Sequence, residues 1–108
     1  MYRLHCLVPQ LLRTDVFDDW LRGLRDLTGR ARVDMRIKRL ASANPGDVRP
    51  VGKGVSELRI DTGPGYRVYY AASGDELILL LAGGDKSTQA RDIETALALW
   101  KDWKEARQ

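Results

Sequence analysis

The sequence has a single cysteine, Cys6, and a single histidine, His5, among its 108 residues. One cysteine excludes an internal disulfide and suits a reducing cytosol, where we expect Cys6 to be a small buried hydrophobe. Without a Cys/His cluster no zinc site is expected, and we expect no cofactor. His5 lies in an alternating segment and is interpreted as a solvent-facing strand residue rather than a catalyst.

Long apolar runs are missing as well. Arg3 and His5 interrupt the apolar N-terminal residues and Pro9 follows them, so this segment lacks the apolar core of a signal peptide. No stretch approaches the roughly 20 apolar residues that a membrane-spanning helix needs. We therefore expect a cytoplasmic protein.

Charged residues are abundant but unevenly distributed. Residues 1–54 contain 11 Lys and Arg against 6 Asp and Glu, whereas residues 55–108 contain 7 against 9. A basic N-terminal half favours an anionic partner, with nucleic acid as the first candidate. The length and the 44% hydrophobic content are typical of one globular domain, which we expect to occupy residues 1–108.

The N-terminal half predicts a short strand followed by a helix. The strand is either the alternating segment 2–8 or residues 10–13, and the sequence leaves both open. Thr14 and Asp15 are residue types that cap helix N-termini. The helix that follows has the apolar spacing of a surface helix, formed by Phe17, Trp20, Leu21 and Leu24.

A second, basic helix is expected from about Arg30 to Ser42, after a break around Thr28-Gly29. With the first helix it would form an αα-hairpin on the sheet. Its cations can bind phosphates by releasing counterions, which makes Arg36 and Arg39 candidate substrate-binding residues. The alternative is a solvated face, or one that meets an acidic protein partner. The inner stripe is Val33, Ile37 and Leu40, and the cations are Arg30, Arg32, Arg36, Lys38 and Arg39.

The C-terminal half predicts a sheet of consecutive strands. Residues 47–52 and 55–61 form two strands, and the turn Thr62-Gly63-Pro64-Gly65 leads into the next, from Tyr66. The apolar run within residues 76–82 is typical of a strand covered on both faces, so we expect it to be central.

A polar turn over residues 83–87 is expected to open the last helix, with Asp85 or Ser87 as its cap. Backbone amides at such a helix start can receive an anion. The helix then carries a polar stripe of Lys86, Gln89 and Asp92 and an apolar stripe of Ile93, Leu97 and Trp100, and it is expected to fray from Trp103.

The turn at residues 62–65 predicts the register of one hairpin. Arg59 then lies opposite Arg67, and Glu57 lies opposite Tyr69. Two opposed arginines repel each other unless an anion lies between them, which indicates a phosphate site. The alternative is a pair of solvated arginines, one of them neutralised by Glu57. We expect Leu58, Ile60, Val68 and Leu79 to point inward against the helices, with Arg59 and Arg67 together on the opposite face.

The blocks SELRID, GPGYRVYY and LLLAGGDKSTQARDI resemble HigB-type addiction-module killer proteins of the RelE/ParE toxin superfamily. The resemblance extends from about Thr14 to Trp103. It implies an α+β fold, with a twisted, mostly antiparallel sheet of four to five strands, an N-terminal αα-hairpin on one side and a C-terminal helix. It also implies the toxin of a type II toxin–antitoxin system, a metal-independent endoribonuclease that enters the ribosomal A site and cleaves mRNA.

The resemblance implies partners as well. Such toxins are held inactive by a cognate helix-turn-helix antitoxin, and any contact with operator DNA would occur only through the complex. Arg67 matches the arginine of the GYR motif, Arg59 a basic strand position, and Lys86 a basic residue after GGD. Glu57 departs from the pattern, because some ribosome-dependent members have a cation there, and Asp92 stands where RelE has a tyrosine.

Cleavage of RNA without metal requires a base for the 2′-oxygen, cations for the phosphorane and a proton for the 5′-oxygen. We therefore assign Arg67, Lys86 and Asp92 to catalysis, with Asp92 as the base. Arg59, Gln89, Arg36 and Arg39 are assigned to substrate binding. The alternative function is a ParE-type gyrase inhibitor that binds and cleaves nothing, since fold does not decide function. A purely regulatory nucleic-acid binder that uses the basic helix is a third candidate.

Overall fold

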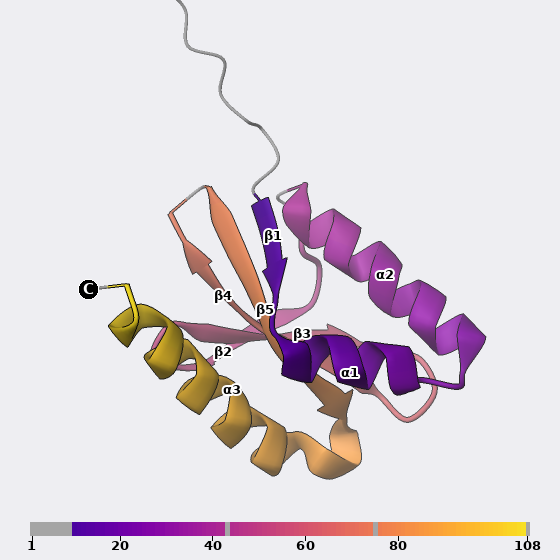
Figure 1. Cartoon of the computed structure of the whole chain (residues 1–108). Coiled ribbons are helices and arrows are strands. Elements are labelled where there is room, and N and C mark those ends of the chain that lie inside the picture. The colour runs from indigo at the N-terminus through magenta and orange to yellow at the C-terminus, as the bar shows by residue number, and fades with distance from the viewer. Residues whose placement is uncertain (1–9, 43, 75, 108) are drawn as a thin grey trace, which may run out of the picture.

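The computed structural model describes residues 10–42, 44–74 and 76–107, and it has a five-stranded mixed sheet between two layers of helices (Figure 1). The strand order is β1-β5-β4-β3-β2, with β1 parallel to β5 and the other pairs antiparallel. The strands are β1 (Gln10–Arg13), β2 (Val48–Gly52), β3 (Val55–Ile60), β4 (Tyr66–Ser73) and β5 (Leu77–Asp85), and the helices are α1 (Asp15–Gly23), α2 (Leu27–Ala41) and α3 (Gln89–Glu105).

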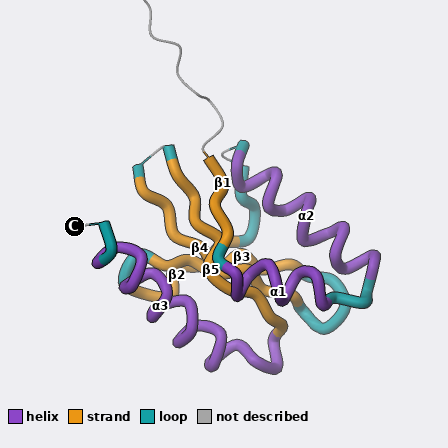
Figure 2. Tube along the Cα trace, viewed as in Figure 1, coloured by secondary structure: helices purple, strands orange, loops and turns teal. Residues whose placement is uncertain are grey.

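The predicted α+β fold is confirmed. Helices α1 and α2 cover one face of the sheet and α3 covers the other, so each face has its own apolar core (Figure 2). Residues 10–13 form the first strand, one of the two predicted alternatives. The other alternative, with His5 and Cys6, lies outside the described residues. No helix within the described ranges is long and apolar enough to cross a membrane.

Helix α1 begins as predicted, at a threonine cap. The Thr14 hydroxyl accepts a hydrogen bond from the Phe17 N–H at 3.0 Å and donates one to the Leu81 carbonyl at 2.6 Å. The same side chain therefore caps the helix and ties it to β5. Phe17 and Leu21 are buried in the core that α1 shares with the sheet.

The predicted break at Thr28-Gly29 is wrong, because α2 begins at Leu27 and includes both residues. The Asp26 carboxylate caps this helix by accepting the Gly29 N–H at 3.0 Å. Glycine is needed at position 29 for space, since a Cβ there would collide with the Tyr66 ring and with Asp26. The predicted inner stripe of Val33, Ile37 and Leu40 is buried.

The charge of Asp26 should make stability depend on pH. Its carboxylate accepts the Gly29 N–H and the Tyr66 hydroxyl (2.9 Å), and these bonds hold the pKa of Asp26 below its ordinary value of 3.8. A lowered folded pKa stabilises the protein above 3.8, and this contribution is lost as the pH falls through the folded value. Asp26→Asn should therefore lower the free energy of unfolding at neutral pH, and the difference from wild type should vanish well below pH 3.8.

Urea unfolding across this pH range measures the effect. Asp34→Asn, on the exposed face of α2, is the matched control and should show no converging difference. A constant difference between Asp26→Asn and wild type at every pH would mean that the charge of Asp26 does not stabilise the fold.

The β3–β4 register is the predicted one, with Arg59 opposite Arg67 and Glu57 opposite Tyr69. The predicted position of Leu79 is wrong, because Leu79 packs on the α3 side and not with Leu58. The β4–β5 register shifts between Tyr69 and Tyr70, which leaves one extra residue in β5. An extra residue reverses the alternation of every side chain beyond it. Three of the four residues predicted to point inward do share the α1/α2 face: Leu58, Ile60 and Val68.

Strand β5 also differs from the prediction at its end. It continues through Gly83 and Gly84 to Asp85, where a turn was expected, and β4 rather than β5 is the middle strand. Both glycines are needed for space. A Cβ at Gly83 would collide with the Trp20 ring, and a Cβ at Gly84 with the Asp92 carboxylate.

The predicted fraying from Trp103 is wrong as well, because α3 continues through Glu105. The Trp103 ring stacks on that of Trp100 with 5.5 Å between centroids, and the Arg107 guanidinium lies 3.8 Å above the Trp103 ring. These contacts give the last turn apolar and cation–π stabilisation that a solvated tail would lack.

Candidate functional site

A buried carboxylate lies between the two opposed arginines. Glu57 is 2% exposed, and its Oε1 lies 3.6 Å from Arg59 Nε and 3.7 Å from Arg67 Nε. All three side chains therefore share the sheet face that α3 covers. The anion that the register required is thus supplied by the protein itself. An external phosphate would have to compete with Glu57 for the same position.

Helix α3 closes the other side of this carboxylate. The side-chain amide of Gln89, the first residue of α3, donates to Glu57 Oε2 at 2.6 Å. Tyr69 is fully buried on the same face, and its hydroxyl has no hydrogen-bond partner among the described residues. Burial and then the negative charge of Glu57 strongly raise the pKa of Tyr69.

The guanidinium of Arg67 is only partly satisfied. Its Nη1 donates to the carbonyls of Gly65 at 3.1 Å and Tyr66 at 3.3 Å. Its Nε is buried and has no hydrogen-bond partner within the described ranges. Since an arginine offers five N–H donors, Arg67 retains donors for another acceptor.

Lys86, the basic residue after GGD, lies near Arg67. A Cβ at Gly65 would lie 3.3 Å from Arg67 Nη1 and 3.5 Å from Lys86 Cβ, so both residues flank this glycine. Gly65 has a φ of +82°, which favours glycine in any case. Lys86 is exposed, whereas Arg67 is buried. The pair thus presents one accessible and one buried cation.

Asp92 lies on the same face of the sheet, above the β5 residue that pairs with Arg67. Arg67 pairs with Gly84, and the Asp92 carboxylate occupies the space where a side chain of Gly84 would lie. Asp92 accepts a hydrogen bond from the Thr88 hydroxyl and is 8% exposed. Its position beside a cation suits a base, and its burial limits access to it.

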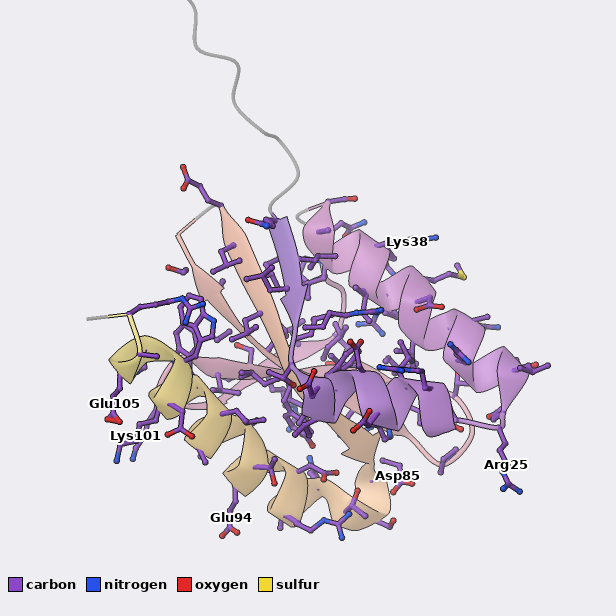
Figure 3. All side chains as sticks on the ribbon, in the orientation of Figure 1. Arg25, Lys38, Asp85, Glu94, Lys101 and Glu105 are labelled. Atoms are coloured by element: carbon purple, nitrogen blue, oxygen red, sulfur yellow. The ribbon has the colours of Figure 1, made fainter. Side chains whose placement is uncertain are left out.

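The predicted anion-receptive helix start is occupied by a carboxylate. Residues Lys86–Thr88 form a 3₁₀ turn that Asp85 caps by accepting the Ser87 N–H at 2.8 Å. The Ser87 hydroxyl and this N–H lower the pKa of Asp85, with a smaller effect from Arg67. Figure 3 shows Asp85 at the point where β5 meets α3.

The structure does not bring Arg36 and Arg39 into this cluster, because α2 lies on the opposite face of the sheet. The Arg36 guanidinium donates to the carbonyls of Arg59 at 2.6 Å and Pro45 at 2.9 Å. Burial lowers the pKa of Arg36, followed by the repulsion of Arg39. Arg36 therefore ties α2 to the end of β3, and Arg39 is exposed on α2.

Tyr69 is the residue of this cluster that the sequence did not assign to the site. The predicted register already placed it opposite Glu57. Strand periodicity does not reveal that Tyr69 is buried under α3, because consecutive residues of β4 are buried on both faces. Within the described residues, no group of three or more His, Cys, Asp or Glu is arranged to hold a metal ion.

Comparison with known proteins places this site in a family. The pattern of the family described as Phage derived protein Gp49-like (DUF891) matches residues 19–101, which include the whole cluster. An uncharacterized protein of Haemophilus influenzae is 49% identical over 90 residues, which cover 83% of this chain and 91% of that protein. The chain belongs to the Gp49-like family of phage-derived proteins, a family of toxin–antitoxin toxins of the RelE/ParE type.

Proposed function

We propose that this chain, as one domain over residues 1–108, is a HigB-type toxin that cleaves mRNA on the ribosome in the cytoplasm. A helix-turn-helix antitoxin restrains it and alone mediates contact with operator DNA. The observation that carries the proposal is the convergence of Arg59, Arg67 and Lys86, from three segments, beside the start of α3. A ribosome-bound substrate is needed because positioning supplies much of the rate.

The cluster offers each group that the cleavage requires. In this mechanism the phosphate of the substrate displaces Glu57 from between Arg59 and Arg67, and their guanidinium forks hold the phosphorane charge. Asp92 takes the proton of the 2′-hydroxyl, and Lys86 supplies one to the departing 5′-oxygen. Gln89, released from Glu57, donates to a phosphate oxygen.

The two residues on α2 have different roles. Arg36 positions β3 by donating a hydrogen bond to the Arg59 carbonyl from the opposite face of the sheet, and it does not bind phosphate. Arg39 is exposed and contacts the RNA backbone outside the scissile phosphate. The structure thus favours Arg39 over Arg36 as a direct substrate contact.

Primer extension on translated mRNA tests this function. Expressed without antitoxin, the wild-type protein should arrest growth and cut mRNA only while ribosomes translate it. Asp92→Asn keeps the shape of the side chain but removes a base, so cleavage should fall by about 100-fold or more. Asp102→Asn, at an exposed position of the same helix, is the matched control and should cut like wild type.

A gyrase supercoiling assay on the same preparation distinguishes the second candidate. The burial of Arg67 and Asp92, each beside an internal partner, favours a ParE-type inhibitor that binds gyrase and cleaves nothing. Inhibited supercoiling with intact mRNA would refute the nuclease and support the gyrase inhibitor.

A further inference from the structure

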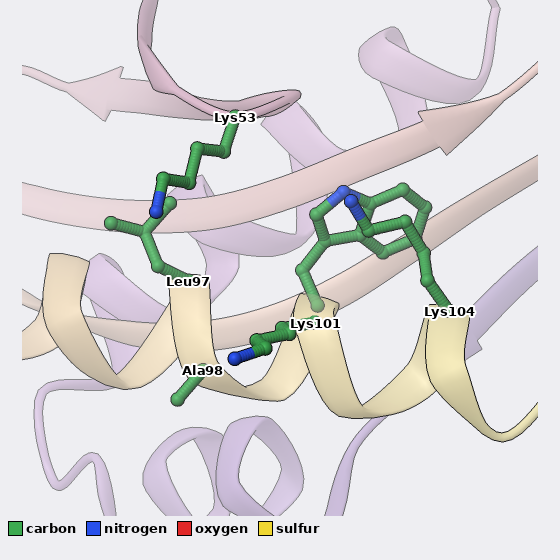
Figure 4. A pocket seen from close by; sticks show the side chains of 6 residues that line it. Lys53, Leu97, Ala98, Lys101 and Lys104 are labelled. Carbon is green, nitrogen blue, oxygen red and sulfur yellow. The ribbon is translucent and has the colours of Figure 1, made fainter.

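A groove lies at the other end of α3 from the arginine cluster. Its volume is about 250 Å³, and it runs between the β2–β3 turn and the last turns of α3. Figure 4 shows Lys53 reaching from the turn toward Leu97, while Lys101 and Lys104 extend from α3. The lining residues are Lys53, Leu97, Ala98, Trp100, Lys101 and Lys104.

The groove combines an apolar floor with a cationic rim. Leu97 and Ala98 form the floor, and Trp100, whose ring faces are covered by Lys104 and Trp103, lines the groove beside them. None of the three rim lysines forms an ion pair with a described residue, although Glu105 follows Lys101 by one helical turn. A cavity of about 150 Å³ accepts a benzene molecule, so this groove has room for one large apolar side chain.

Lys53, which lines the groove, has an unusual backbone conformation. Its φ of +51° is the only positive value of a non-glycine residue in the described ranges. Glycine or asparagine adopts this conformation more readily than lysine. The neighbouring Gly54 lets the turn approach α3, because a Cβ there would lie 3.2 Å from Trp100 Nε1. The turn thereby brings a third cation to the two from α3.

The aromatic rings of this region are already covered. Lys104 Nζ lies 5.2 Å from the centroid of Trp100, whose ring stacks on that of Trp103, and Arg107 covers Trp103. Nucleic-acid surfaces of this kind use open aromatic faces on which bases stack. With its faces covered, the groove suits an acidic peptide better than a single-stranded nucleic acid.

We propose that this groove binds an acidic segment of the antitoxin, with one apolar side chain on the floor and carboxylates on the three lysines. The identity of the partner rests on the toxin role proposed above, but the groove itself does not use the arginine cluster. Gln89 and Lys101 are 12 residues apart, which is about 18 Å along α3. Binding in the groove and cleavage at the cluster can therefore be tested separately.

Fluorescence anisotropy of a short glutamate-rich peptide with one central leucine measures the binding. The triple variant Lys53→Asn, Lys101→Gln, Lys104→Gln should bind the peptide about tenfold more weakly. Replacing the leucine of the peptide by alanine should also weaken binding to the wild-type protein. Ala98→Glu places a negative charge at the groove from an exposed position and should weaken binding without disturbing the core.

The matched control is the triple variant Arg30→Gln, Arg32→Gln, Lys38→Gln, which removes the same charge from α2. It should bind the peptide like wild type. If both triple variants lost peptide binding equally, or if only the α2 variant lost it, the proposal would be overturned. Tighter binding of oligouridylate than of the peptide in the groove would also overturn it. The groove variant should still cleave translated mRNA, so a failure of the nuclease proposal would be seen separately.

Discussion

Arg67→Lys should reduce mRNA cleavage by about 100-fold while the protein remains folded. The lysine keeps the positive charge that balances the buried Glu57, but it loses the planar fork that holds two phosphate oxygens. Arg67→Ala is a poorer test, because it would remove one of the two cations beside the buried Glu57 and destabilise the fold. Primer extension on ribosome-bound mRNA, with toxin concentrations matched, measures the effect.

Arg49→Lys is the matched control, since Arg49 lies on β2 directly opposite Glu57 but is exposed. It should cleave like wild type. Unchanged cleavage by Arg67→Lys, with normal thermal unfolding in both variants, would show that a guanidinium at this position is not needed and would remove Arg67 from the catalytic role.

Glu57→Gln should destabilise the protein by about 3 kcal/mol, because it removes the carboxylate that separates two cations. Arg67 is 5% exposed and cannot turn to water, so its repulsion with Arg59 persists in the variant. Urea unfolding measures the loss. Inorganic phosphate should then stabilise Glu57→Gln more than wild type, since an added anion can take the place of the carboxylate.

Chloride at the same ionic strength separates this specific effect from general screening. Glu94→Gln, an exposed charge change on α3, should unfold like wild type and gain nothing from phosphate. If phosphate stabilises Glu57→Gln no more than it stabilises wild type, the space between the arginines is not a phosphate site. The mechanism in which substrate displaces Glu57 would then be wrong.

Arg67→Lys and Glu57→Gln test different states of the protein. Arg67→Lys acts on the transition state and Glu57→Gln on the free protein. In the proposed mechanism, the internal neutralisation of the cations keeps the toxin inactive toward free RNA until a positioned substrate displaces the carboxylate. In this scheme the ribosome supplies the free energy of positioning that the displacement requires.

The register of the β3–β4 hairpin was predictable from sequence because a four-residue turn and strict alternation fix it. A slip of one residue would have moved Leu58 and Arg59 to the wrong faces. The apolar stripes of α1 and α2 were predictable for the same kind of reason, since Phe17 and Val33 lie on periodic faces. These features depend on neighbours along the chain.

The positions of Leu79 and Gly84 depended on contacts between distant segments. A single extra residue in β5 reversed the face of Leu79, and no local pattern marks where such a bulge falls. Gly83 and Gly84 looked like a turn because glycine usually marks one. They lie in a strand, where the missing side chains leave space for Trp20 on one face and Asp92 on the other.

The sequence by itself determined the pairing of Arg59 with Arg67, and the tertiary structure decided what lies between them. Alternation places residues on a face, but it carries no information about which side chains from another strand or helix meet there. The sequence offered Glu57 as the neutraliser of one arginine, but the tertiary structure buries it between both of them, under α3 and with its second oxygen bound by Gln89. Because these groups are buried, removing the carboxylate would leave cations without a partner, and Arg67 is less exposed to water than Arg59.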